Sequence, residues 1–351
     1  MNVQHNTLLG PFTSLRCGGP AEVLITTSST EELLEGLRTA KGGPLSMLGY
    51  GTNSLISDYG LAGTTIITHG GDISFQDDLL VADAGAWWGD LVQLSIEKDL
   101  WGIELMSGIP SSVGGAVMGN IAAYGQQVSD TLAWIEVFNR DTTRVQKLSA
   151  DEITFNYRSS SLHKQPNIVI LRAAFRLSPQ STTHLAYASA QSAAEKLGLD
   201  TESLNNRRLI ILEARRQAGS LWDPNDANAQ HTAGSFFKNP LVTQAQAEEI
   251  AKYDETGKSL ERLLAQNRIH GGSISRSSAA HVLLAAGFKR GQTWGAVRLH
   301  PDHILKIENI GNAKAQEIYN VAQRIIQRVK EELTIVLEPE VTFIGQFDSV
   351  K

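Results

Sequence analysis

Residues 107–130 read SGIPSSVGGAVMGNIAAYGQQVSD, and the fold assignment starts from this run of small residues. Glycine, serine and alanine side chains clustered this tightly leave a smooth concave wall with little charge. Such a wall suits a flat, uncharged ring system whose edge is read by backbone donors and acceptors. Small side chains also let a helix pack closely against a strand. The residues alone leave both interpretations open.

A second glycine-rich segment, GYGTNSLISDYG at residues 49–60, follows a short strand predicted at 45–48. Glycines let the backbone approach a ligand closely, and exposed N–H groups beside threonine and serine hydroxyls suit a pyrophosphate. The alternative is a tight turn with Asn53 in the left-handed region. The common nucleotide motifs fail, because G-x-G-x-x-G is not completed and G-x-x-x-x-G-K-[ST] does not occur.

The pattern of strands and helices indicates the fold class. Short β-rich runs alternate with helical patches, without the regular long βαβ repeat of a dinucleotide fold, so we expect an α+β fold. Residues 187–216 are predicted to be helical, and residues 335–344 are predicted to form the last strand. A regular apolar stripe predicts another helix that begins at Gly311; its members are Ile318, Val321, Ala322, Ile325 and Val329.

The composition argues against several classes of protein. The chain has 351 residues, of which 42% are hydrophobic and 19% charged, and its formal net charge is −6. This balance argues against a general nucleic-acid binder, because little in it would neutralise a phosphate backbone. Cys17 is the only cysteine, so intramolecular disulfides are excluded. We expect a soluble cytosolic protein without membrane insertion, because the sequence shows neither a secretory leader nor an apolar run of membrane-spanning length.

Three polar residues are candidates for catalysis. Arg158 lies among aromatic and hydroxyl side chains and can clamp a carboxylate, although an ordinary surface arginine is the alternative. Ser235 follows a glycine and precedes two phenylalanines, so it can donate or relay a proton; without G-x-S-x-G around it, a hydrolytic nucleophile is a poor interpretation. Glu340 lies in an apolar strand, where a carboxylate is costly unless it is functional or ion-paired. The histidines show no metal-ligand spacing, so we expect no metal site.

Segments spread along the chain resemble the UDP-N-acetylenolpyruvoylglucosamine reductase family in their order and spacing. Two of them, AGSFFKNP at 233–240 and LEPEVTFIG at 337–345, are specific to that family. The other matching stretches are TSLRCGGPAEV at 13–23, GYGTNSLISDYG at 49–60, SGIPSSVGGAVMGNIAAYGQQVSD at 107–130, FNYRSSS at 155–161 and NAKAQEIYNVAQRI at 312–325.

The resemblance implies a fold and an activity. The fold would be a PCMH-type (vanillyl-alcohol-oxidase-like) FAD-binding domain of two lobes at residues 1–180, with the lobe boundary near 70–75. A smaller α+β substrate-binding domain at 181–351 would follow, and its last strand would return to the active site. The implied activity is that of UDP-N-acetylmuramate dehydrogenase, which reduces UDP-N-acetylglucosamine enolpyruvate in peptidoglycan synthesis. FAD and NADPH are the implied cofactors, a sugar nucleotide is the substrate, and we expect a cytoplasmic monomer.

The resemblance also implies roles for individual residues. Arg158 and Glu340 would stabilise an enolate-like intermediate, and Ser235 would protonate it. Substrate contacts are implied for Tyr187, Arg215 and Asn239. FAD contacts are implied for the two glycine-rich segments, at Gly49, Tyr50, Gly51, Thr52, Asn53, Ser54, Gly108, Ile109, Pro110, Ser111, Gly114, Gly115, Asn120, Ala123, Tyr124 and Gly125.

The chain departs from the family pattern at some positions. Ser159 stands where an aspartate usually follows the arginine, and Ala218 replaces a lysine that would meet phosphate. Two other hypotheses therefore stay open. One is a flavoprotein of the same fold that oxidises another small substrate with oxygen. The other is a non-catalytic paralogue that binds nucleotide or flavin.

Overall fold

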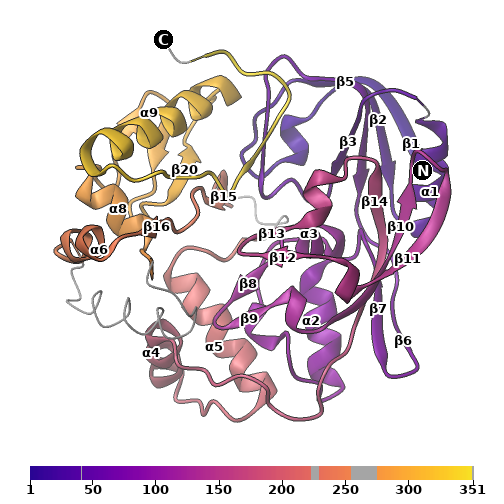
Figure 1. Ribbon diagram of the computed structural model, residues 1–351, viewed down its shortest axis with the longest axis horizontal. Helices are drawn as coiled ribbons and strands as arrows, with labels where there is room; N and C mark the ends of the chain where they lie inside the picture. Colours follow the sequence, from indigo (N-terminus) through magenta and orange to yellow (C-terminus); the bar gives the residue numbers. More distant parts are fainter. Residues whose placement is uncertain (41, 223–228, 254–274, 350–351) are drawn as a thin grey trace. The chain divides into compact units, whose positions relative to one another are not determined.

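The computed structural model describes residues 1–40, 42–222, 229–253 and 275–349. The chain forms two compact units, each built from segments that are far apart in the sequence (Figure 1). Unit 1 comprises Met1–Thr7, Ala21–Gly51 and Leu61–Ala229, and unit 2 comprises Leu8–Pro20, Thr52–Gly60 and Gln230–Lys351. The functional division predicted at residue 180 stays a prediction.

Unit 1 contains a four-stranded sheet in the order β1-β2-β5-β3. Its strands are β1 (Asn2–Leu8), β2 (Pro20–Thr27), β3 (Leu45–Leu48) and β5 (Leu61–Thr68). Strands β2 and β3 both run parallel to β5, and α1 (Thr30–Thr39) connects β2 with β3. Ser29 caps α1, because its side chain accepts a hydrogen bond from the N–H of Glu32. Leu33 and Leu37 of α1 are buried in the core beneath the helix.

A second sheet of unit 1 has five strands in the order β11-β10-β14-β7-β6. Its neighbouring strands are antiparallel, and they are β6 (Ile73–Gln76), β7 (Leu79–Asp83), β10 (Leu132–Asn139), β11 (Arg144–Ser149) and β14 (Ile168–Phe175). Helices α2 (Trp88–Glu97) and α3 (Val113–Met118) share one core with this sheet. This mixture of short strands and helices confirms the predicted α+β class.

The segment predicted as one helix over 187–216 is two helices, α4 (Ala188–Leu197) and α5 (Leu204–Gln217). Gly198 ends α4 in the left-handed conformation, with φ 65°, and its N–H donates to the carbonyls of Ala194 and Glu195. Ser203 then caps α5 by accepting a hydrogen bond from the N–H of Asn206. The helical prediction was therefore correct in type, but it overlooked the stop signal that the glycine provides.

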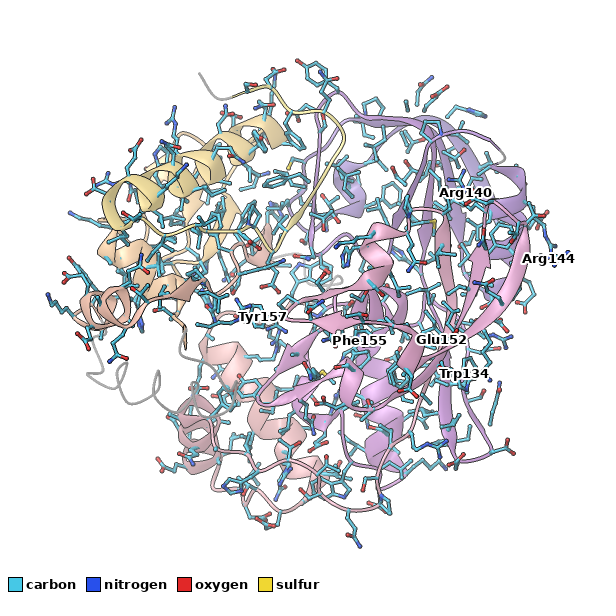
Figure 2. The ribbon with its side chains drawn as sticks, viewed as in Figure 1. Trp134, Arg140, Arg144, Glu152, Phe155 and Tyr157 are labelled. Carbon is cyan, nitrogen blue, oxygen red and sulfur yellow. The ribbon has the colours of Figure 1, made fainter. Side chains whose placement is uncertain are left out.

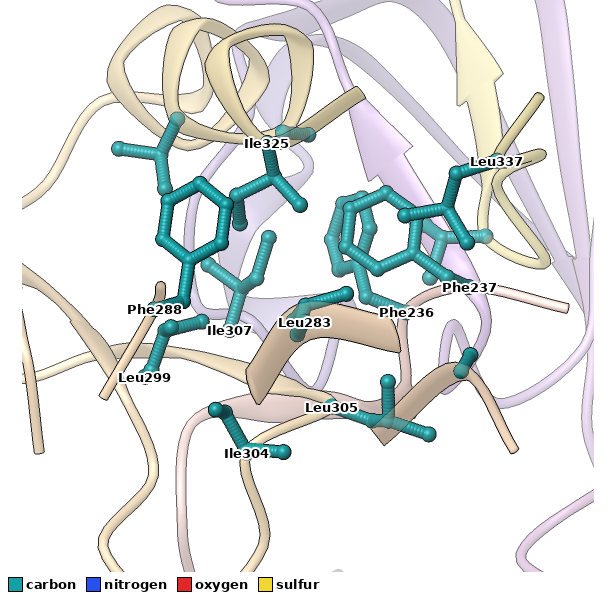
Figure 3. Close-up of a cluster of buried hydrophobic side chains, with 14 of the residues drawn as sticks. Phe236, Phe237, Leu283, Phe288, Leu299, Ile304, Leu305, Ile307, Ile325 and Leu337 are labelled. Carbon is teal, nitrogen blue, oxygen red and sulfur yellow. The ribbon is translucent and has the colours of Figure 1, made fainter. Parts of the chain in front are cut away.

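Unit 2 contains a four-stranded sheet in the order β15-β20-β19-β18, with helices around it. The strands are β15 (Thr232–Ser235), β18 (Thr293–Trp294), β19 (Val297–Leu299) and β20 (Lys306–Asn309); the helices are α6 (Gln244–Ala251), α8 (Ala279–Ala285) and α9 (Ala315–Leu333). Figure 3 shows the core, where Phe236 and Phe237 lie near Leu337, and Ile325 reaches down from α9. The apolar stripe predicted for α9 is confirmed, because all five of its residues are buried.

The strand predicted at 335–344 is shorter than expected. Only β21 (Thr342–Ile344) is a regular strand, and it pairs in parallel with β4 (Ser54–Ile56). Before it, the chain makes an isolated antiparallel bridge between Phe237 and Pro339. The N–H of Lys238 bonds to the carbonyl of Glu338 and the N–H of Glu340 bonds to that of Phe236, so Pro339 occupies a position that needs no N–H for the ladder.

Short elements complete the chain. The two-residue strands are β8 (Ala122–Ala123), β9 (Gln126–Gln127), β12 (Phe155–Asn156), β13 (Ser159–Ser160), β16 (Leu241–Val242) and β17 (Ser275–Arg276). The 3-10 helices are η1 (Gly10–Phe12), η2 (Glu104–Met106), η3 (Val128–Asp130), η4 (Ala150–Glu152) and η5 (Ser161–Lys164). Within the described parts of the chain, none of the helices has the length and apolar character that a bilayer crossing requires.

Candidate active site

The two glycine-rich segments meet in unit 1. A Cβ atom added at Gly49 would lie only 2.4 Å from the Oγ atom of Ser112, so no larger residue fits there without a shift. The same hydroxyl caps α3 by accepting from the N–H of Gly115 at 3.1 Å. A Cβ at Gly114 would lie 3.0 Å from that of Ala84, so the close packing of a helix against a strand, one of the two interpretations left open by the sequence, is present. The small residues therefore serve packing in any case.

Aromatic side chains hold the beginning of the first segment. The ring of Tyr50 stacks on that of His69 with centroids 4.3 Å apart, and it meets Trp87 edge-on at 4.5 Å. The Nε2 atom of His69 is 3.0 Å from the carbonyl oxygen of Gly49. Burial lowers the pKa of His69 and raises that of Tyr50, so both side chains are neutral at pH 7. The segment is thus fixed by uncharged contacts.

The backbone of the candidate site is strained at particular residues. Tyr124 and Gly125 form the two-residue turn between β8 and β9, and both have positive φ, 50° and 94°. Such hairpin turns require positive φ, which glycine adopts freely and tyrosine does not. Asn120 (φ 42°) and Arg158 (φ 53°) also lie in this region of φ. Strained residues of this kind concentrate at functional sites, where surrounding contacts hold them.

Arg158 lies at the turn between β12 and β13, on the hairpin where Figure 2 labels Phe155 and Tyr157. Its Nη1 atom donates a hydrogen bond of 2.6 Å to the carbonyl of Ala122. This bond ties the arginine to the second glycine-rich segment. Ser159, which departs from the family pattern, pairs with Asn156 across the same hairpin.

Arg215, at the end of α5, reaches the same segment from another side. Its Nε atom donates to the carbonyl of Gly108 at 3.0 Å, and its Nη2 atom donates to that of Ser220 at 2.9 Å. Burial is the main cause that lowers the pKa of Arg215, and the nearby charge of Arg158 lowers it further. Two guanidinium groups close enough to repel each other create a site that an anion would stabilise.

Two tyrosines border these arginines. The rings of Tyr124 and Tyr187 meet edge-on, with centroids 5.4 Å apart. Burial raises the pKa of both hydroxyls, while Arg215 lowers that of Tyr124 and Arg158 lowers that of Tyr187. The structure therefore brings together Arg158, Arg215, Tyr124 and Tyr187, which the sequence had suggested separately from distant segments.

Arg208 belongs to this region but was missed by the sequence analysis. It lies on α5 one turn before Leu212, whose Cδ2 atom would be 2.9 Å from a Cβ at Gly108. Its Nη1 atom is buried and has no hydrogen-bond partner among the residues that the structure describes. Burial lowers its pKa, and the charge of Asp90 on α2 partly offsets this. Positions 208, 212 and 215 share a helix face, which is the one signal that the sequence offers.

Unit 2 brings together Ser235 and Glu340. Ser235 ends β15 and pairs with Lys306 of β20. The next residue, Phe236, accepts a hydrogen bond at its carbonyl from the N–H of Glu340, at 2.9 Å. The carbonyl of Glu340 in turn accepts from the Nδ2 atom of Asn53 at 3.1 Å. The last strand thus returns to the first glycine-rich segment and to Ser235 within one unit.

Asn239 has a structural task in unit 2. Its Oδ1 atom accepts a hydrogen bond of 2.9 Å from the N–H of Ala279, at the beginning of α8. Its carbonyl accepts from the Nη1 atom of Arg276 at 2.8 Å. The implied substrate contact of Asn239 stays a prediction, and so does a meeting of Arg158 with Ser235 and Glu340.

Two histidines contact Lys306, the buried strand partner of Ser235, through the backbone. His300 and His303 lie in the predicted loop, between β19 and β20, and the backbone of Lys306 bonds to both. Burial lowers the pKa of His303 to about 4, and the charge of Lys306 adds to this effect. Across the described ranges no group of three histidine, cysteine or acidic residues is placed to hold a metal ion.

Comparisons with known proteins match nearly the whole chain. Residues 21–149 match the model of an FAD binding domain, and residues 224–344 match that of the UDP-N-acetylenolpyruvoylglucosamine reductase C-terminal domain. The reductase of this name from Thermobifida fusca is 32% identical, with 97% of this chain and 98% of that protein covered. That from Streptomyces avermitilis is 32% identical, with 97% and 94% covered. The crystal structure of the reductase from Thermus caldophilus superposes with a TM-score of 0.66 at 25% identity, and covers 98% of this chain and 100% of that one.

Proposed function

The chain belongs to the UDP-N-acetylenolpyruvoylglucosamine reductase family, and we propose that it performs the family's reaction with Arg158, Ser235 and Glu340 as catalytic residues. The protein is an FAD-dependent oxidoreductase that uses NADPH to convert UDP-N-acetylglucosamine enolpyruvate into UDP-N-acetylmuramate for peptidoglycan synthesis. The observation that best supports the assignment of Arg158 is its place at the strained turn between β12 and β13, where its Nη1 atom donates a hydrogen bond of 2.6 Å to the carbonyl of Ala122 in the second glycine-rich segment.

The residues of unit 1 fit FAD. The buried Nη1 atom of Arg208 lacks a partner among the described residues, and an anionic group of the cofactor would supply one. The glycine-rich segments would hold the pyrophosphate and the flavin ring, in the way proposed for residues 49–54 and 108–125. When bound, FAD carries the hydride from NADPH to the enolpyruvyl carbon. Binding of the substrate, stabilisation of the developing charge and proton transfer would be carried out by side chains of the protein.

Arg158 and Arg215 would act on the substrate's negative charge. Addition of hydride to the terminal carbon breaks the carbon–carbon double bond and moves an electron pair towards the carboxylate. A guanidinium group fixed by its bond to Ala122 is already oriented when this charge develops. Electrostatic stabilisation by such preorganised donors is commonly the largest contribution to catalysis.

Ser235 would complete the reaction by donating the proton of its Oγ atom to the carbon next to the carboxylate, which gives the lactyl ether. Glu340 would lie beside it, because its N–H bonds to the carbonyl of the residue after the serine. A carboxylate there can hold the serine hydroxyl or return a proton to it. Within the same proposal, the protein acts in the cytoplasm as a monomer on a sugar nucleotide.

Replacing Ser235 by alanine tests the proposal. We expect anaerobic reduction of the bound flavin by NADPH to stay near the wild-type rate in Ser235→Ala. Reoxidation by the enolpyruvyl nucleotide should fall by about a thousandfold, because general acid catalysis contributes on that order. Stopped-flow absorbance of the flavin follows both half-reactions.

Thr232→Val is the matched control, since Thr232 lies on the same strand and its Oγ1 atom has no partner among the described residues. Both half-reactions should be unchanged in this variant. The proton-donor assignment is wrong if Ser235→Ala turns over at the wild-type rate. The substrate assignment is wrong if, in the wild-type protein, NADPH reduces the flavin but the enolpyruvyl nucleotide does not reoxidise it.

A further inference from the structure

A buried polar cluster in unit 1 lies behind the glycine-rich segment and outside the site described so far. It consists of Glu104, Gln126 and Arg207, whose exposed fractions are 0%, 2% and 3%. Glu104 and Arg207 form an ion pair with 3.1 Å between Oε1 and Nη1. Taking two charges out of water at this depth is costly, so removing one partner leaves the other in an unfavourable environment.

The hydrogen bonds of Gln126 join the β8–β9 hairpin to η2. The Oε2 atom of Glu104 accepts from the N–H of Gly102 at 2.8 Å and from the Nε2 atom of Gln126 at 2.9 Å. The Oε1 atom of Gln126 accepts from the N–H of Leu105 at 2.8 Å. The amide of Gln126 therefore clamps η2, which leads directly into Ser107 and Gly108.

Arg207 extends the cluster to α5. Its Nε atom donates to the carbonyl of Thr201 at 2.6 Å, and Nη1 also donates to that of Thr183 at 2.8 Å. Its guanidinium group lies 4.8 Å from the ring centre of Trp101. Arg215, two turns farther along α5, then holds the carbonyl of Gly108.

The bonded segments are those that carry the candidate site. Gln126 immediately follows the strained turn at Tyr124 and Gly125, and it pairs with Ala123 across the β8–β9 hairpin. The preceding residue, Ala122, accepts the hydrogen bond of Arg158. A shift of Gln126 would therefore move the hairpin, and with it the arginine that the hairpin holds.

From these contacts we infer that Glu104, Gln126 and Arg207 form a positioning network that fixes the glycine-rich segment, the Tyr124 turn and the Arg158–Arg215 pair relative to one another. Its catalytic consequence rests on the proposed function. The charges of Glu104 and Arg207 strengthen the network, because hydrogen bonds to ionised groups in a water-excluded site are stronger than hydrogen bonds between neutral groups. The network touches no reacting atom, so its effect reaches the reaction through Gly108 and Ala122.

Gln126→Leu is the sharpest test, because it removes the two side-chain hydrogen bonds of Gln126 while Glu104 keeps its ion pair with Arg207. We expect FAD to bind about tenfold more weakly and turnover per bound flavin to fall roughly ten- to hundredfold, with a smaller rise in KM, since a displacement of about 1 Å has effects of this size. FAD affinity is measured by fluorescence titration of the apoprotein, and turnover is normalised to flavin content well below the unfolding temperature. Glu104→Gln should show the same changes more strongly.

Glu136→Gln is the matched control. Glu136 on β10 accepts two hydrogen bonds from Arg172 on β14, at 3.0 and 2.8 Å, and these bonds join two strands of the five-stranded sheet rather than the glycine-rich segment. The control should lower the unfolding temperature without changing FAD affinity or turnover per flavin. If Gln126→Leu behaves like the control, the network is merely structural and the inference falls. The FAD titration decides this even if the enolpyruvyl nucleotide proves not to be the substrate.

Discussion

Replacing Gly49 by alanine tests the central structural statement, that the two glycine-rich segments lie against each other. The added Cβ atom would be 2.4 Å from the Oγ atom of Ser112 and 3.0 Å from its Cβ atom. Ser112 is buried, so its side chain has little room to move. The simplest relief is rotation of the hydroxyl away from Gly115, which ends the capping bond of α3.

The magnitude follows from two contributions. Overpacking of a buried contact costs about 1–3 kcal/mol. Loss of the serine cap adds about 1 kcal/mol. We therefore expect the free energy of unfolding of the apoprotein to fall by about 2–4 kcal/mol in Gly49→Ala, a large share of the net stability of an ordinary domain. Because the first glycine-rich segment is a candidate FAD-binding segment, the affinity of the protein for FAD should fall as well.

A double-mutant cycle isolates the contact. Ser112→Gly alone should cost only a few tenths of a kcal/mol, because glycine is a tolerable N-cap. Ser112→Gly removes the Oγ and Cβ atoms that crowd the new Cβ atom. The third nearby atom, the backbone nitrogen of residue 112, stays at 3.9 Å, which is an ordinary contact distance. The double variant Gly49→Ala/Ser112→Gly should therefore recover most of the loss. Urea unfolding followed by tryptophan fluorescence gives all four free energies.

Gly43→Ala is the control for the change of residue type, since nothing lies within 4 Å of its added Cβ. It should stay within about 0.5 kcal/mol of the wild type, as surface substitutions do. The reasoning is refuted if Gly49→Ala matches this control, or if Ser112→Gly fails to rescue it. Either result would mean that the two segments do not touch as described.

Three further outcomes follow from the same structure. Arg158→Lys keeps the charge but loses the planar fork, so turnover should fall by about a hundredfold while NADPH still reduces the flavin, as measured by the two half-reactions. Burial raises the pKa of Cys17 to about 12, so a thiol reagent at pH 8 should label it only when the protein unfolds. Burial lowers the pKa of His303 from its ordinary value of 6.5 to about 4 in the folded protein, so the unfolded chain takes up the proton first as the pH falls. Stability should be lost as pH falls from 6.5 to about 4, on the order of 3 kcal/mol, and urea unfolding at each pH should show less loss in His303→Gln.

The sequence predicted those parts of the fold that local patterns control. The stripe from Ile318 to Val329 has the period of a helix, and α9 buries that face. The stop at Gly198 is also a local signal, although a longer helical pattern runs across it. The family resemblance, and the fold that it implies, came from short motifs in a fixed order. That order can be recognised in the sequence without any knowledge of contacts.

The sequence could not predict how distant segments bond to one another. Nothing near Arg215 indicates that its guanidinium group ends on the carbonyl of Gly108. Nothing near Glu104 indicates that its partner is Arg207, because the two are separated by 103 positions. The motif of Asn239 did not indicate that its side-chain oxygen accepts a hydrogen bond from the N–H of Ala279 at the beginning of α8. Side-chain pairing of this kind depends on the final packing, and periodicity carries no information about it.

Backbone strain and buried charge at the candidate site support each other. Tyr124 and Arg158 both adopt positive φ, which costs about 1–2 kcal/mol for each residue with a Cβ atom. A chain that followed its local preferences would relax both turns and move Arg158, which lies at one of them. The bond from Arg158 to the carbonyl of Ala122 and the clamp of Gln126 on Leu105 oppose that relaxation. These bonds hold the guanidinium group of Arg158, and the bond to Gly108 holds that of Arg215, so both donors are oriented before an anionic ligand binds and the strain of the turns is offset by the surrounding contacts.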